Sequence, residues 1–240
     1  MALPKLTTPT YELEIPSTDE KISYRPFLVK EEKILLLAME SGKSDDIVNA
    51  VGQIVSECTF NKMKVANMPM FDVEYLFLNI RAKSVGEMSK IKVLCPDDRK
   101  TEVPVTVYVD EIEVVRPEGH TQDIVLDKNM TLRMKYPSLN QFIENNFDTE
   151  DDPDTFVDKT FKLVADCMDT VYTKEEAWDS KDYTSNERKQ FIEQLNSKQY
   201  KEVERFFATM PKLSHTIEVI NPNTKKKSNI VLEGLADFFG

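Results

Sequence analysis

Cysteine is scarce in this sequence: the 240-residue chain contains three, at positions 58, 95 and 167. An odd number of widely separated cysteines is not a disulfide framework, and a reducing, cytosolic compartment is the simplest explanation. Long apolar runs are also missing, the longest being residues 34–39. A membrane-spanning helix needs about 18 apolar residues in succession, so we expect no contact with a membrane.

Positive charge is in short supply as well. The chain carries 31 lysines and arginines against 42 aspartates and glutamates, which gives a formal net charge of −11. Phosphate backbones bind clustered basic side chains, so we do not expect nucleic acid as a partner. The compact basic run at residues 225–227 lies in a turn, where such charge is typically solvated.

One pattern occurs three times: an alternating segment, a turn rich in polar residues with a proline at a fixed place, and a second alternating segment. The copies cover residues 11–22, 90–103 and 216–230, and their turn prolines are Pro16, Pro96 and Pro222. Such a pattern is typical of a β-hairpin with one buried face. Apolar residues at helical spacing occupy the segments between the copies. The sequence therefore predicts an α+β protein in which β-hairpins and small antiparallel sheets are interleaved with helices.

Helices are predicted near residues 29–41, 44–58, 71–85, 156–171, 184–195 and 200–210. The third of these carries apolar residues around most of its circumference, so we expect it to be central. Thr184 and Glu187 have the spacing of a capping box. Two further short strands, 112–115 and 124–134, are expected to pair through the turn-rich residues 116–119.

The second and third hairpins align at an offset of 126 residues, as Pro96 and Pro222 show. Each hairpin also follows a helix rich in aromatic residues. This similarity favours two related helix-plus-hairpin halves, 1–127 and 128–240. The first would hold the N-terminal hairpin, three helices and the second hairpin, and the other a helical segment, the C-terminal hairpin and an apolar tail. Independent origin of similar hairpin turns is the alternative.

Motifs for metal binding and catalysis are incomplete. Cys95-Pro96-Asp97-Asp98 resembles one knuckle of a zinc ribbon, but structural zinc needs four ligands, usually from two C-x-x-C knuckles. The aligned positions of the third hairpin are Asn221 and Thr224. The two histidines, at 120 and 215, lie outside any nucleophile signature. We expect no metal, no cofactor and no catalytic residue, although the many carboxylates leave an unrecognised carboxylate site open.

The two terminal segments are the candidates for partner binding. Residues 1–10 include two prolines and three threonines, which favours an extended arm that could lie along a neighbour's sheet edge. The last six residues carry large apolar groups that either cap the core or dock into a partner. The predicted partner-binding residues are Leu3, Leu6, Leu235, Phe238 and Phe239.

Several longer segments are distinctive as a set. They are Met1-Ala-Leu-Pro-Lys-Leu-Thr-Thr-Pro-Thr-Tyr-Glu-Leu, Ser23-Tyr-Arg-Pro-Phe-Leu-Val-Lys-Glu-Glu-Lys, Met68-Pro-Met-Phe-Asp, Arg81-Ala-Lys-Ser-Val-Gly, Cys95-Pro-Asp-Asp, Met210-Pro-Lys-Leu and Val231-Leu-Glu-Gly-Leu-Ala-Asp-Phe-Phe. Together they resemble the baseplate hub proteins of T4-like tailed bacteriophages, over nearly the whole length of the chain.

The resemblance implies a non-enzymatic structural or assembly protein that binds other hub and tail subunits. Such a protein is made in the cytoplasm of the infected bacterium. It is either a hub subunit that stays in the tail baseplate of the virion or an assembly chaperone that leaves. The alternative is an enzyme, for example a hub-associated cell-wall hydrolase. That activity requires a buried glutamate in an apolar pocket with a second carboxylate nearby.

Overall fold

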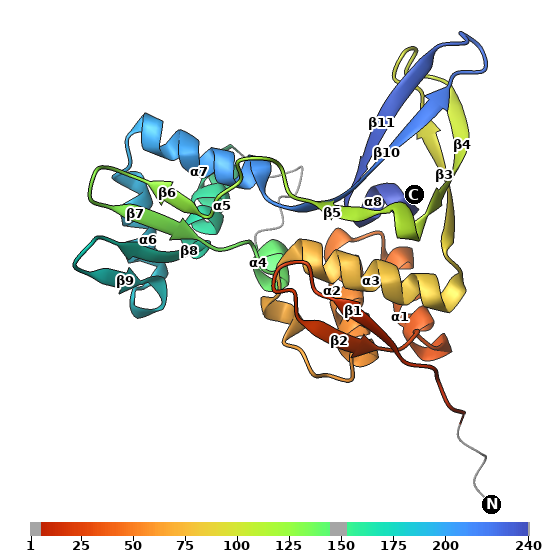
Figure 1. Ribbon diagram of the computed structural model, residues 1–240, viewed down its shortest axis with the longest axis horizontal. Helices are drawn as coiled ribbons and strands as arrows, with labels where there is room; N and C mark the ends of the chain where they lie inside the picture. The colour runs from red at the N-terminus through yellow and green to blue at the C-terminus, as the bar shows by residue number, and fades with distance from the viewer. Residues whose placement is uncertain (1–5, 145–152, 240) are drawn as a thin grey trace, which may run out of the picture. The chain divides into compact units, whose positions relative to one another are not determined.

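A computed structural model of the chain describes residues 6–144 and 153–239, and the chain forms two compact units (Figure 1). Unit 1 comprises Met1–Val65, Phe71–Val115 and Lys212–Gly240, and unit 2 comprises Ala66–Met70 and Arg116–Pro211. These units divide the chain differently from the expected halves 1–127 and 128–240. The reason is that the C-terminal hairpin pairs with a strand near residue 114 and so belongs to unit 1.

In its described residues, unit 1 combines four α-helices with three small antiparallel sheets. Its elements are β1 (Tyr11–Glu14), β2 (Lys21–Tyr24), α1 (Val29–Ser41), α2 (Ser44–Cys58), α3 (Met70–Val85), β3 (Met88–Leu94), β4 (Glu102–Tyr108), β5 (Glu113–Val115), β10 (Lys212–Ile220), β11 (Lys227–Glu233) and α8 (Gly234–Phe239). The sheets are β1-β2, β3-β4 and β11-β10-β5. Small antiparallel sheets among helices confirm the predicted α+β class.

Unit 2 is built around one antiparallel sheet with the strand order β6-β7-β8-β9. Its strands and principal helices are β6 (Asp123–Val125), β7 (Thr131–Met134), α4 (Leu139–Glu144), α5 (Pro153–Asp166), β8 (Met168–Tyr172), β9 (Ala177–Asp179), α6 (Ser185–Glu193) and α7 (Ser197–Thr209). The capping box of Thr184 and Glu187 is present at the start of α6, as predicted.

Helix α3 is central to unit 1, as its apolar circumference predicts. Its buried positions are Phe71, Asp72, Val73, Leu76, Phe77, Leu78, Ile80 and Ala82. Leu78 and Ala82 belong to a core cluster that also contains Ile91, Val107 and Leu213 from the strands. One face of this helix therefore supports both the second and the third hairpin.

Two predicted elements differ from the structure. The helix expected to continue to residue 171 ends at Asp166, and β8 begins at Met168 because this segment pairs with β7. The apolar spacing of Val164, Met168 and Val171 fits a helix, but sheet pairing decides the conformation. The strand at 112–115 does not pair with the one at 124: β5 pairs with β10, and β6 pairs with β7.

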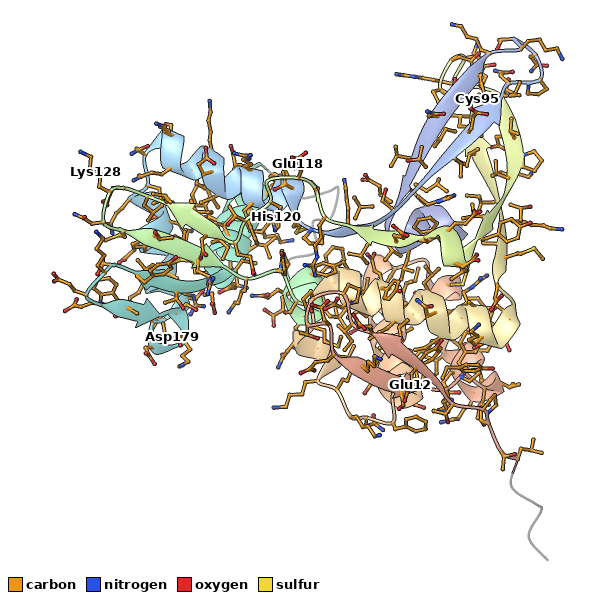
Figure 2. The ribbon with its side chains drawn as sticks, in the orientation of Figure 1. Glu12, Cys95, Glu118, His120, Lys128 and Asp179 are labelled. Carbon is orange, nitrogen blue, oxygen red and sulfur yellow. The ribbon has the colours of Figure 1, made fainter. Side chains whose placement is uncertain are left out.

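His120 attaches the segment after β5 to α7 within unit 2 (Figure 2). Its ring stacks on Phe206 and Tyr136, with ring centroids 5.4 and 5.7 Å away. Nδ1 lies 3.0 Å from Thr209 Oγ1, and Nε2 lies 3.0 Å from the Tyr136 hydroxyl. Thr209 Oγ1 donates to the Arg205 carbonyl, so Nδ1 carries the proton and donates to Thr209. Burial lowers the pKa of His120, which favours this neutral form.

Phe238 of α8 completes the core of unit 1, and we expect its removal to destabilise that unit. Its side chain is 0% exposed and belongs to the cluster formed by both hairpins. Phe238→Ala should lower the free energy of unfolding by about 3–5 kcal/mol, because a cavity replaces the ring. Val231→Ala, at a position 52% exposed on β11, is the matched control and should change it by less than about 1 kcal/mol. Denaturant unfolding measures both, and equal stability of the two variants would contradict the prediction.

Candidate interaction site

The three proline turns share one hydrogen bond and one left-handed residue. The residue before each proline, Ile15, Cys95 or Asn221, is the last of its alternating segment and is at most 2% exposed. Its carbonyl accepts the N–H of the fifth turn residue in all three copies, at 2.8, 2.9 and 2.9 Å. Its own N–H is also paired across the turn. Proline suits the second position because it fixes φ and keeps the preceding residue extended.

The fifth residue of each turn is left-handed although it is not glycine. The φ angles are 57° at Asp19, 52° at Arg99 and 63° at Lys225. A side chain with a Cβ pays about 1–2 kcal/mol for this conformation, and aspartate tolerates it better than arginine or lysine do. The second and third hairpins therefore hold long basic side chains at positions that glycine would occupy without strain.

Each turn is held by an aspartate. Asp72, buried in α3, accepts hydrogen bonds from the backbone N–H and the hydroxyl of Ser17 in the first turn. Asp97 of the second turn accepts from Asn221 Nδ2 at 2.9 Å and from the hydroxyl of Thr224 in the third turn. The second and third hairpins are thus joined at their tips, where Figure 2 labels Cys95.

A third hydrogen bond strengthens this junction: Asn223 Nδ2 donates to Thr101 Oγ1 at 3.0 Å. The hydrogen bonds from Thr224 and Asn221 hold the pKa of Asp97 below its usual value, so it stays ionised. We call Asp97, Thr101, Asn221, Asn223 and Thr224 the tip junction. It joins residues more than 120 positions apart in the sequence.

The turn that resembles half of a zinc site in the sequence lies against the third turn in the structure. The positions that correspond to zinc ligands are Cys95, Asp98, Asn221 and Thr224, and the last two bind Asp97. Asp98 accepts the N–H groups of Lys100 and Thr101 and so closes its own turn. Among residues 6–144 and 153–239, no group of three or more His, Cys, Asp or Glu side chains could hold a metal ion.

Loss of the Asp97 carboxylate should loosen both hairpin tips. In Asp97→Ala, Asn221 Nδ2 and the Thr224 hydroxyl lose their acceptor, so the third turn should open more often. Amide hydrogen exchange should become faster at Thr224 and Lys225 and remain unchanged in β1 and β2. Asp110→Ala, which changes the charge equally at an exposed position, is the control. Unchanged exchange at residues 224 and 225 would show that the junction does not hold the turn.

The predicted partner-binding residues are separated by the structure. Phe238 is fully buried, and Leu235 is half-buried against the same core. The Ser89 hydroxyl also donates to the Phe238 carbonyl at 2.7 Å, which fixes α8 on β3. Leu6 is 94% exposed in the arm. Leu3 and the side chain of Phe239 lie outside what the structure describes.

Glu74 is a half-buried carboxyl beneath the first turn of α8. Its Oε1 accepts the N–H of Leu235 at 3.3 Å, and a Cβ at Gly234 would lie 3.3 Å from the same atom. Gly234 also has a φ of 67°, which favours glycine. Burial raises the pKa of Glu74 from 4.5 to about 7, although the Leu235 N–H opposes this rise. A raised glutamate pKa is one element of a hydrolase site, but α8 covers this carboxyl.

Stability of unit 1 should fall as the pH rises from about 4.5 to 7. The folded pKa of Glu74 exceeds the unfolded one, so its contribution is full below 4.5 and is lost as the pH passes about 7. Glu74→Gln should stabilise unit 1 above pH 7 by up to about 3 kcal/mol and flatten this pH dependence. Glu40→Gln, an exposed change on α1, is the control. Melting temperatures between pH 4.5 and 8 measure the effect, and parallel profiles for both variants would refute it.

Exposed apolar side chains gather on α1, which the sequence analysis did not select as a site. Val29 is 79% exposed, and Leu36, Leu37 and Met39 are each 55–56% exposed. We call these four residues the α1 face. Large exposed apolar side chains on one helix are typical of protein-binding surfaces. The sequence contained one indication of this surface, the apolar run at residues 34–39. The run alone shows only that the segment is too short to cross a membrane, and not which of its side chains are exposed.

Unit 2 has an apolar cavity of about 390 Å³ between β8, β9 and α6. Its lining includes Met130, Trp178, Tyr183 and Phe191. Arg188 borders it, donates to the carbonyls of Ser180 and Tyr183 and pairs with Asp166 at 2.7 Å. Glu187, Gln190 and Gln194 also line it, so the cavity offers polar as well as apolar contacts.

In the described part of the chain, no helix is both long enough and apolar enough to cross a membrane. A family model described as T4 bacteriophage base plate protein matches residues 8–240. No curated protein matches the chain, and no solved structure does so either.

Proposed function

The chain belongs to the family of T4 bacteriophage base plate proteins, and from that membership we propose that it works at the baseplate hub, where it binds other hub subunits during tail assembly. The family match carries this proposal because it extends over residues 8–240, nearly the whole chain. Membership supports a structural role connected with the phage baseplate. The hub position, the partners and synthesis in the host cytoplasm are the parts that we propose.

The surface of the protein supports a role in binding other proteins. The α1 face leaves large apolar side chains in water, and burial of apolar surface gains roughly 25 cal/mol per Å². Leu6 in the N-terminal arm is exposed in the same way. We propose that the α1 face and the arm contact hub subunits. Phe238 fits this role less well, because it reaches a partner only if α8 leaves the core.

Co-purification tests this proposal. A tagged full-length chain expressed during phage infection should recover baseplate proteins that mass spectrometry identifies. The double variant Leu36→Ser and Leu37→Ser should reduce this recovery at least about tenfold, which corresponds to about 1.4 kcal/mol of binding energy. The matched control is Met88→Ser with Leu94→Ser, since these residues are 56% and 49% exposed on β3.

The outcomes separate the possible roles. Failure of the unmodified chain to recover baseplate proteins would refute the proposal, and equal loss in both variants would remove the α1 face from it. Mass spectrometry of purified particles then distinguishes the two forms of the role. A virion subunit is present in the particles, whereas an assembly chaperone is recovered from infected cells and is absent from them.

A further inference from the structure

The tip junction gathers basic side chains from two turns that are far apart in the sequence. Arg99 and Lys100 belong to the second hairpin, and Lys225 and Lys226 belong to the third. All four residues are exposed. Because Asp97 binds Asn221 and Thr224, the two turns lie side by side at one end of unit 1 (Figure 1). The four basic residues therefore share that end. We call these four residues the basic tip.

Two of the carboxylates nearest in sequence are already engaged, whereas a third, Glu102, is exposed at the start of β4. Asp97 accepts from the third turn, and Asp98 accepts two backbone N–H groups of its own turn. Lys227 beside the tip pairs with Glu218 of the adjacent strand. Within the described residues, by contrast, the basic tip makes no ion pair. Residues 95–101 and 221–226 hold four cations and two carboxylates, 4 − 2 = +2, on a chain whose net charge is −11.

The backbone conformation gives a second reason to regard these side chains as functional. Arg99 and Lys225 occupy the left-handed position of their turns, with φ of 52° and 63°. Glycine would relieve that strain, and neither side chain makes a hydrogen bond or ion pair with another described residue that would compensate for it. Left-handed residues other than glycine cluster at functional sites. The first turn has the same conformation at Asp19, so it is the basic side chain at this position that distinguishes the two facing turns.

From these observations we propose that the basic tip binds a carboxylate-rich surface of another baseplate protein. This inference rests on the proposed function and names one of its contact surfaces. Opposite charges across an interface speed association and select the partner. A nucleic acid would also be attracted to the tip, but the net charge of −11 repels a long polyanion over a Debye length of about 10 Å at moderate salt. A compact acidic patch on a protein is repelled less by this net charge than a long nucleic acid is.

Neutralising the basic tip tests the proposal. The tip variant combines Arg99→Gln, Lys100→Gln, Lys225→Gln and Lys226→Gln. The control variant removes the same charge from four exposed lysines of unit 1 that lie outside these turns, as Lys21→Gln, Lys43→Gln, Lys64→Gln and Lys90→Gln. Recovery of baseplate proteins from infected cells should fall at least about tenfold for the tip variant and stay within about twofold for the control. The loss should be largest at low salt.

Zero-length carbodiimide cross-linking locates the contact, because it joins an amine to a carboxylate only when the two are in contact. In the unmodified complex, Lys100, Lys225 or Lys226 should be joined to aspartate or glutamate of an identified baseplate protein. Full recovery by the tip variant, or an absence of such cross-links, would overturn the inference while leaving the proposed function intact. Failure of the unmodified chain to recover any baseplate protein would instead refute the proposed function. Recovery that disappears after nuclease treatment would assign the tip to nucleic acid and also overturn the inference.

Discussion

The association of the second and third hairpins is the constraint on which the architecture of unit 1 depends. Their inner faces share one core with α3 and Phe238, and the tip junction joins their far ends. Strand β10 also pairs with β5, where Lys212 lies opposite Val115. The chain must therefore leave unit 1 after residue 115 and return at 212. Residues 116–211 form most of unit 2 as an insertion whose two ends are neighbours.

Aspartates and glutamates in this acidic chain serve as internal acceptors as well as surface charge. Asp72 holds the first turn against α3 and Asp97 joins the other two. Glu31, fully buried, accepts from Arg25 and from the Leu28 N–H at the start of α1. These bonds lower the pKa of Glu31 to about 2, so it remains charged in the core. Glu74 differs because a single backbone N–H does not offset its burial.

These features change what the surface offers to partners. The apolar C-terminal segment completes a core, whereas the α1 face and the basic tip are accessible to partner proteins. The α1 face is apolar, and the basic tip is charged. A hub protein that carried both could obtain affinity from the first and partner selection from the second, because apolar burial supplies free energy and charge complementarity discriminates between surfaces.

Local patterns in the sequence predicted much of the fold. Alternation and proline placement predicted the three hairpins, and helical spacing predicted α1, α2 and α3 within one residue. The helix predicted to reach residue 171 was wrong beyond Asp166, because apolar residues at 164, 168 and 171 fit either conformation and pairing with β7 decided between them. The predicted pairing of β5 was wrong because a local turn suggested a nearby partner strand, whereas the residues with which β5 pairs lie 97 to 101 positions away in the sequence.

By itself, the sequence determined the α+β class, the hairpin turns, the absence of a complete metal-binding motif and the resemblance to a phage family. These properties depend on short-range spacing or on residue identity. Only the tertiary structure decided that two of the turns face each other, that Phe238 lies in the core and that Arg99 and Lys225 share one tip. Each of these depends on contacts between distant residues, whose free energy is not encoded in any single segment.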